Sequence, residues 1–450
     1  MSTSAQPSAS SVVASKGKTG GGKASAPEPI FYDVSELFHV SRASFRYYGI
    51  ARTVMEIGAE LKRADPAVRF VVYAPATRRF HEVDVRVTTG DAPLDIGLPP
   101  AARPIKLRHY APERRALSRL AHRPFALAVR AANRWRWRAV TGRAAPIVNL
   151  NGRLLLSLAR PKLMAEFLLA TERGGERPRF RPVLYDMIPV RDANGGNVPD
   201  LPRFARKFLH DNAYAIERAE RVATISAFTR DETSRAAERG LLPRPPAMVP
   251  IPLAHELRSG DGSPDLPPDL PERFVLGVGT APGRKNLEGV LRALAILRER
   301  GRSVPHLVLA GAVRSRTREL LEGDEAASIR DRVVLIENPD QSSLVELYQR
   351  ASALVIASFV EGWGLPLGEA LWCGTPGLAA DIPALNEVGG DLAHYFDPND
   401  AAALAALIDR FANDPRALAA ERKRLANARE RLRSWADVAA DMAAFARATS

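Results

Sequence analysis

The feature that most constrains this chain is a repeated alternation of short apolar runs with amphipathic helical stretches. That alternation predicts βαβ units, and therefore parallel sheets covered by helices. Strands are expected at 70–74, 183–185, 221–225, 274–278, 306–310, 333–336, 354–357 and 376–379. Helices are expected at 52–63, 204–218, 286–300, 344–351, 366–373, 401–413, 415–433 and 435–449. Because the alternation occurs in two blocks, the sequence predicts two doubly wound domains with ligands at the carboxyl ends of their strands.

Composition marks the boundaries between the expected domains. Residues 1–29 are rich in Ser, Ala, Gly and Lys, which is typical of a disordered tail. The first domain is expected at 30–258 and the second at 273–433. The segment 259–272 between them contains four prolines, as linkers often do. A last amphipathic helix is expected within 434–450.

Several protein classes are excluded by composition. The chain has 46% hydrophobic and 26% charged residues, which are globular values and exclude a wholly disordered protein. The single cysteine, Cys373, excludes an intramolecular disulfide and a cysteine-rich zinc site. The longest clean apolar runs, such as 351–358, are strand-sized, and no apolar leader is present, so we expect a cytoplasmic protein. His255, where the chain leaves the first domain, is expected to have a hinge or packing role rather than a catalytic one.

Positive charge is concentrated in the first part of the chain. Residues 1–272 contain 42 Lys and Arg against 28 Asp and Glu, whereas residues 273–450 contain 22 against 23. The excess peaks from Lys106 to Arg143, within a basic insertion at about 100–145 that also contains Trp135 and Trp137. A solvated helical face, a surface for anionic lipid or a lipid-phosphate acceptor, and a nucleic-acid surface all fit. No nucleic-acid-binding motif accompanies the patch, so nucleic acid is not expected.

A glycine-rich turn follows the expected strand 274–278 and leads into a helix. It runs from Gly277 to Asn286 and includes Gly279, Thr280 and the adjacent cations Arg284 and Lys285. Glycines allow a ligand to approach the backbone, and a helix N-terminus favours an anion. Arginine can hold phosphate oxygens in a bidentate manner, and lysine adds a point charge. The turn therefore predicts a diphosphate site, although a plain βα turn with exposed cations also fits.

A second motif, residues 361–370, follows the expected strand 354–357. Glu361 lies in a loop with two glycines, Gly362 and Gly364, and Glu369 lies about one turn into the next helix. The glycines leave backbone N–H groups available to a ligand, and Glu369 could hold vicinal hydroxyl groups. The alternative is that one glutamate is a solvated charge and the other an acid at a helix start.

The two glutamates, separated by seven residues, resemble the signature of family 4 of the retaining glycosyltransferases. The likeness extends over 274–398 and, more loosely, over 33–35, 49–52, 185–189 and 224–229, where the chain is similar to bacterial mannosyltransferases. The resemblance implies the GT-B fold, an α/β architecture with two Rossmann-like domains facing across a cleft. It also implies that the helix in 434–450 crosses back to the first domain.

The resemblance implies roles for individual residues. Arg284 and Lys285 would neutralise the donor diphosphate, Glu361 would lie near the donor sugar, and Glu369 would bind the ribose. Asp186 is our candidate on the acceptor side. The donor-binding set is Gly49, Gly279, Thr280, Arg284, Lys285, Gly362, Trp363, Gly364, Leu365 and Glu369. Many family members have arginine in place of Thr280 and histidine in place of Tyr185, so phosphate and sugar contacts at these two positions are in question.

The expected function is a retaining, metal-independent transfer of a sugar, with GDP-mannose the leading donor, to a glycan or lipid-linked acceptor in cell-surface polysaccharide biosynthesis. No metal and no cofactor are expected, because Arg284 and Lys285 can carry the charge and no Asp-x-Asp lies on the donor side. The basic insertion would face the acceptor or the inner membrane surface. A sugar-nucleotide epimerase on the same fold and a non-enzymatic protein that binds through the basic patch are the alternatives.

Overall fold

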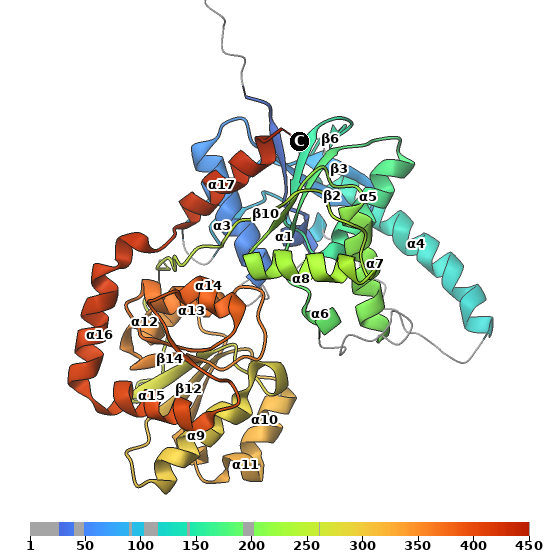
Figure 1. Cartoon of the computed structure of the whole chain (residues 1–450). Coiled ribbons are helices and arrows are strands. Elements are labelled where there is room, and N and C mark those ends of the chain that lie inside the picture. Colours follow the sequence, from blue (N-terminus) through green and yellow to red (C-terminus); the bar gives the residue numbers. More distant parts are fainter. Residues whose placement is uncertain are drawn as a thin grey trace, which may run out of the picture.

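The computed structural model describes residues 27–39, 49–89, 92–102, 116–141, 145–191, 202–260 and 262–449 (Figure 1). Most of the expected tail, residues 1–26, lies outside the described residues, as do the parts of the basic insertion at 103–115 and 142–144. None of the helices in the described ranges is long and apolar enough to cross a membrane.

The first domain is built on a sheet with the order β10-β9-β8-β7-β1-β2-β3-β6. Its strands are β1 (Ile30–Asp33), β2 (Arg69–Ala74), β3 (Arg79–Glu82), β6 (Ile147–Val148), β7 (Leu154–Ser157), β8 (Arg179–Leu184), β9 (Val222–Thr224) and β10 (Met248–Pro250). Its helices are α1 (Ser35–His39), α3 (Gly49–Ala64), α4 (Ala116–Thr141), α5 (Pro161–Arg173), α6 (Ile188–Arg191), α7 (Arg203–Ile216) and α8 (Ala227–Glu238). A small hairpin of β4 (Arg86–Val87) and β5 (Leu94–Asp95) lies apart from the sheet.

The second domain has a wholly parallel sheet with the order β13-β12-β11-β14-β15-β16. Its strands are β11 (Phe274–Val278), β12 (His306–Gly311), β13 (Val333–Glu337), β14 (Ala353–Ile356), β15 (Gly377–Ala380) and β16 (His394–Phe396). Its helices are α9 (Leu287–Glu299), α10 (Ser315–Glu322), α11 (Asp324–Ala327), α12 (Gln341–Arg350), α13 (Leu365–Trp372), α14 (Pro383–Gly389), α15 (Ala401–Asn413) and α16 (Pro415–Asn427). The prediction of two doubly wound α/β domains is confirmed.

Two local expectations need correction. The first sheet has an antiparallel edge, because β3 pairs antiparallel with both β2 and β6. The four residues between β2 and β3 turn too sharply for a helical crossover, and Arg78 takes a positive φ of 57° there. The expected helix 415–433 ends at Asn427, because the chain turns through the short 3-10 helix Arg429–Arg431 towards the first domain.

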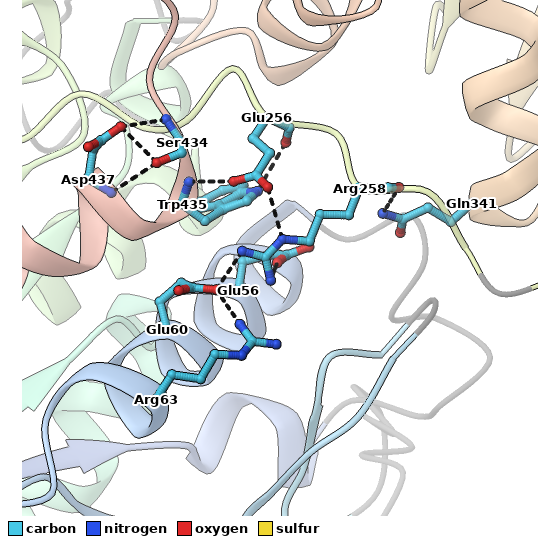
Figure 2. Close-up of polar contacts among 9 residues, drawn as sticks. All are labelled: Glu56, Glu60, Arg63, Glu256, Arg258, Gln341, Ser434, Trp435 and Asp437. Carbon is cyan, nitrogen blue, oxygen red and sulfur yellow. Dashed lines mark hydrogen bonds and ion pairs between the residues drawn. The ribbon is translucent and has the colours of Figure 1, made fainter. Parts of the chain in front are cut away.

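The last helix, α17 (Trp435–Arg447), lies on the first domain, where it packs against α3, β1 and β7 (Figure 1). Its start is held by the chain that leaves the first domain. The buried Trp435 donates its indole N–H to the Glu256 carbonyl at 3.0 Å. Arg258 pairs with Glu256 and also with Glu56 and Glu60 of α3 (Figure 2). These contacts tie both interdomain segments to α3.

Candidate active site

Both sequence motifs lie at the switch point of the second sheet. There β11 neighbours β14, with β12 and β13 on one side and β15 and β16 on the other. Chain connections leave such a point in opposite directions, which opens a crevice at the carboxyl ends of the two strands. The first motif follows β11 and the second follows β14. The topology therefore places the two motifs side by side.

Asn286 joins the two loops at this edge. It takes a positive φ of 53° and accepts the N–H of Gly289, which caps α9. Its amide nitrogen donates to the carbonyls of Ala357, at 3.1 Å, and Pro398, at 2.8 Å. We gave Asn286 no role from the sequence, although an asparagine directly before an amphipathic helix is a recognisable cap signal.

Arg284, Lys285 and Glu361, which we expected in one site, are in contact. Lys285 Nζ lies 2.5 Å from Glu361 Oε1, and Arg284 Nη1 lies 3.3 Å from Glu361 Oε2. Arg284 also donates to the Val360 carbonyl at 2.7 Å, and Ser358 donates to Glu361 Oε1 at 2.7 Å. One carboxylate thus holds two cations at the carboxyl edge of the sheet, and the cluster keeps a net positive charge.

The Glu361 carboxyl is ionised by its surroundings. Burial alone would raise its pKa, because its side chain is only 10% exposed. The charges of Lys285 and Arg284, together with hydrogen bonds from Lys285 and Ser358, outweigh burial and lower the pKa below its ordinary value. Glu361 therefore orients the two cations as a carboxylate throughout the neutral range.

Glu369 lies in α13 and bonds to two residues that we did not predict. Its Oε2 accepts the hydroxyl of Tyr348 at 2.8 Å, and its Oε1 lies 2.5 Å from Arg52 Nη1 of the first domain. Glu369 is itself only 2% exposed. Arg52 falls in the segment 49–52 that carried the resemblance, but its contact with a residue 317 positions away depends on the domain arrangement. Tyr348 carried no signal in the sequence.

Gly362 is required by the close approach of the two domains. A Cβ added there would lie 2.5 Å from the carbonyl oxygen of Tyr185 and 3.0 Å from the Cβ of Asp186. Ser226, also of the first domain, donates its hydroxyl to the Gly362 carbonyl at 2.8 Å. The structure therefore brings Asp186 next to the loop that contains Glu361.

The other predicted donor-site residues lie around this loop. Gly364 has a φ of 116° at the start of α13, a conformation that favours glycine. Trp363 is only 4% exposed, and its indole nitrogen is buried with no hydrogen-bond partner among the described residues. A Cβ on Gly49 would lie 3.8 Å from Leu365 Cδ1, which places the start of α3 against the start of α13.

The turn after β11 contains the remaining two. Gly279 has a φ of 63° and donates its N–H to the Ala310 carbonyl at 2.9 Å. Thr280 packs against Gly277, where its Oγ1 would lie 2.9 Å from an added Cβ.

Among the described residues, no group of three or more His, Cys, Asp or Glu side chains is placed to hold a metal ion.

The basic insertion has two tryptophans with different environments. Trp137 is buried in the first domain against the rings of Phe38, at 5.6 Å, and His81, at 4.8 Å. Trp135 is 72% exposed. In Figure 1, α4 runs away from the body of the domain. Only Trp135 is therefore available to a partner.

Residues 263–432 match the family model described as glycosyl transferases group 1. The matched segment corresponds to the second domain and contains Arg284, Lys285, Glu361 and Glu369. The O-antigen chain mannosyltransferase B of Escherichia coli is 29% identical over 224 residues, which cover 46% of this chain and 55% of that relative. The chain thus spans about half the length of this curated relative.

Two solved structures resemble the whole molecule. Sucrose-phosphate synthase from Thermosynechococcus elongatus has a TM-score of 0.60 at 19% identity and covers 93% of this chain and 98% of its own. Anabaena HepE in complex with UDP has a TM-score of 0.55 at 13% identity, with the same coverage. At these identities the likeness concerns the fold. The solved structures bear out the expected GT-B fold, and the expected likeness to bacterial mannosyltransferases is seen in the O-antigen relative.

Proposed function

We propose that the protein transfers a sugar from a nucleotide-diphospho-sugar, with mannose from GDP-mannose the leading donor, to a glycan or lipid-linked acceptor in cell-surface polysaccharide biosynthesis. The observation that carries the proposal is the cluster of Arg284, Lys285 and Glu361 at the switch point of the second sheet. The match to a bacterial O-antigen mannosyltransferase supports the choice of sugar and pathway.

The cluster suits a reaction in which a diphosphate departs. As the bond between sugar and phosphate breaks, negative charge develops on the diphosphate. Arg284 and Lys285 are already held in place by Glu361, so they can stabilise that charge without reorganisation. One such preorganised contact contributes about 3 kcal/mol to catalysis. We include metal independence in the proposal because these two cations can supply the charge, and retention at the anomeric carbon follows from the family resemblance.

A thermal-shift panel of nucleoside diphosphates and nucleotide sugars tests the donor. A ligand at 100 times its dissociation constant stabilises the folded protein by about 2.7 kcal/mol. We expect GDP and GDP-mannose to give the largest shifts. A larger shift with UDP, the ligand in the HepE structure, would reject GDP-mannose and keep the reaction class. No shift with any member would reject the proposal.

Transfer assays separate this proposal from its two alternatives. An epimerase would convert the nucleotide sugar with no acceptor present. A binding protein built on the basic patch would bind RNA with a steep salt dependence and would tolerate Lys285→Ala and Glu361→Ala. We expect conversion only with acceptor, at a rate that EDTA leaves unchanged. Loss of activity in EDTA that Mg²⁺ restores would reject metal independence.

We also propose that the protein is cytoplasmic and that α4 lies on the anionic inner face of the membrane. The exposed Trp135 has the exposed Arg134 and Arg138 beside it, and this combination suits a headgroup layer. Flotation with vesicles of neutral or anionic phospholipid tests this. We expect co-flotation only with anionic vesicles and its loss in Trp135→Ala. Equal behaviour with both vesicle types would reject the membrane part alone.

A further inference from the structure

Arg52 reaches into the proposed donor site from the opposite domain. It lies one turn into α3 of the first domain, and its Nη1 pairs with Glu369 Oε1 of the second domain at 2.5 Å. Within the described residues, its Nε and Nη2 are buried and have no hydrogen-bond partner. These two nitrogens form one edge of the guanidinium group, with two N–H donors pointing the same way.

Leaving such donors unpaired is costly. A buried polar group without a partner destabilises the protein, and a charged one does so more strongly. Tyr348 donates a hydrogen bond to the other oxygen of Glu369, so both carboxylate oxygens have a partner. Two guanidinium nitrogens of Arg52 have none within the described residues. An oxygen-rich ligand would supply the missing acceptors. The Arg52 side chain is 14% exposed as a whole, although its Nε and Nη2 do not contribute to that exposed part.

Two features favour a phosphate over a neutral acceptor, although the Glu56 carboxyl, one turn along α3, also acts on Arg52. The edge of a guanidinium group matches two oxygens of a phosphate in a bidentate manner. Arg52 follows Gly49, which starts a 16-residue helix with no acidic residue in its first turn. A helix start of this kind favours negative charge. Glu369, the partner of Arg52, is the residue expected to bind the ribose. The phosphate nearest the ribose in a nucleotide is the α-phosphate, so this phosphate would lie nearest Arg52.

We propose that Arg52 is a donor-binding residue contributed by the first domain, and that its unpaired edge takes the α-phosphate of the nucleotide sugar while Glu369 holds the guanidinium in place. This inference rests on the proposed function. Each domain would then bind one phosphate of the diphosphate. Arg52 of the first domain would bind the α-phosphate, and Arg284 and Lys285 of the second domain would bind the β-phosphate and stabilise its charge as it leaves. The donor would then draw the domains together.

Binding of guanosine, GMP and GDP to Arg52→Lys and Arg52→Gln tests the inference. Lysine keeps a charge beside Glu369 but lacks the second N–H edge, so the pair with Glu369 survives. We expect both variants to bind GMP and GDP 10- to 100-fold more weakly, with guanosine affinity, measured by displacement of a fluorescent GDP analogue, changed less than about 3-fold. Arg63→Lys is the matched control, because Arg63 lies on the same helix and pairs with Glu60 of that helix.

The outcomes distinguish the possible failures. Equal losses for guanosine and GDP would mean that Arg52 acts only by organising Glu369, and would overturn the inference. Unchanged affinity for GDP would also overturn it. If GDP fails to bind the unmodified protein, the same measurements are repeated with uridine, UMP and UDP. If neither diphosphate binds, the proposed function falls with the inference. Should Arg52→Gln not fold, Arg52→Lys decides the result.

Discussion

Single charged residues in this protein are held by partners from distant parts of the chain. Glu361 bonds to Lys285 and Arg284, some 76 positions earlier, and Glu369 bonds to Arg52. Each carboxylate is buried, so each depends on its cation. Removing one partner would therefore affect geometry and charge together.

We expect Arg284→Gln to lower kcat about 100-fold, because one of the cations that face the developing diphosphate charge is lost. Steady-state kinetics with saturating acceptor measure the effect. Arg298→Gln is the control, since Arg298 pairs with Asp331 at 2.9 Å on the surface of the same domain. Equal rates in the two variants would contradict a role for Arg284 in charge stabilisation.

We expect Asp33→Asn to change how stability depends on pH. Burial, acting against hydrogen bonds from Ser35 and Ser157, raises the pKa of Asp33 from 3.8 to about 6. Because the folded value is the higher one, protonation favours folding, and this stability is lost as the pH rises from about 4 through about 6. The loss amounts to about 3 kcal/mol.

An asparagine side chain stays neutral over this range, so the Asp33→Asn variant should not show that loss. Denaturant unfolding of both proteins at pH 4 and pH 7 measures the difference. The control is Asp84→Asn, where the side chain is 86% exposed. A difference between Asp33→Asn and the unmodified protein that is the same at both pH values would contradict the assignment.

The sequence predicted the residues of the second motif better than their partners. A spacing of eight positions between Glu361 and Glu369 is visible in one dimension, and so is an adjacent Arg–Lys pair before a helix. Tyr348 carries no local pattern, and Arg52 belongs to the segment 49–52 but shows nothing of its partner, because both contacts form only when the whole fold brings α12 and α3 to α13.

At the scale of elements, the start of helix α8 in the first domain is capped by an acidic side chain of the second domain. Glu387 in α14 accepts the N–H of Ala227 at 2.7 Å and that of Phe228 at 2.6 Å. These are two of the four N–H groups that a helix leaves unpaired at its start. A helix end is therefore completed by the other domain.

We expect Glu387→Ala to lower stability by about 1 kcal/mol, because the carboxylate cap and its favourable interaction with the helix dipole are lost. Thermal unfolding measures the change. Glu238→Ala, at the exposed far end of α8, is the control. Equal midpoints for the two variants would show that the interdomain cap contributes nothing.

In the second domain, most of the expected elements lie within three residues of the observed ones, because its buried parallel strands are continuous apolar runs. The exceptions are the expected helix 415–433, which ends at Asn427, and the elements α10, α11, α14 and β16, which went unpredicted. The first domain was harder, and its central strands β1 and β7 went unpredicted. The antiparallel edge also escaped prediction, since pairing direction depends on the turn geometry at 75–78.

At the scale of the molecule, the two domains are joined by two crossing segments that bind each other. His255 accepts the backbone N–H of Arg433 at 3.1 Å, and its Nε2 lies 3.0 Å from the Val388 carbonyl. Trp435 lies directly beyond, bonded to Glu256. Of the two roles expected for His255, hinge or packing, these buried contacts fit packing at the junction of three segments.

We expect Trp435→Ala to destabilise the protein by about 3–5 kcal/mol, because it removes a fully buried ring that anchors α17. Calorimetry measures the change. Trp135→Ala, which truncates an exposed ring, is the matched control and should stay within about 0.5 kcal/mol of the unmodified protein. A loss of the same size in both variants would contradict the anchoring role.

The return of α17 has a consequence for biosynthesis. Domains usually fold one after another as they emerge, starting at the N-terminus. Here the helix that covers β1 and β7 is translated only after the whole second domain. The face of the first domain that α17 covers therefore stays exposed until the second domain has been translated. Chaperones have their longest opportunity to bind the first domain during that interval.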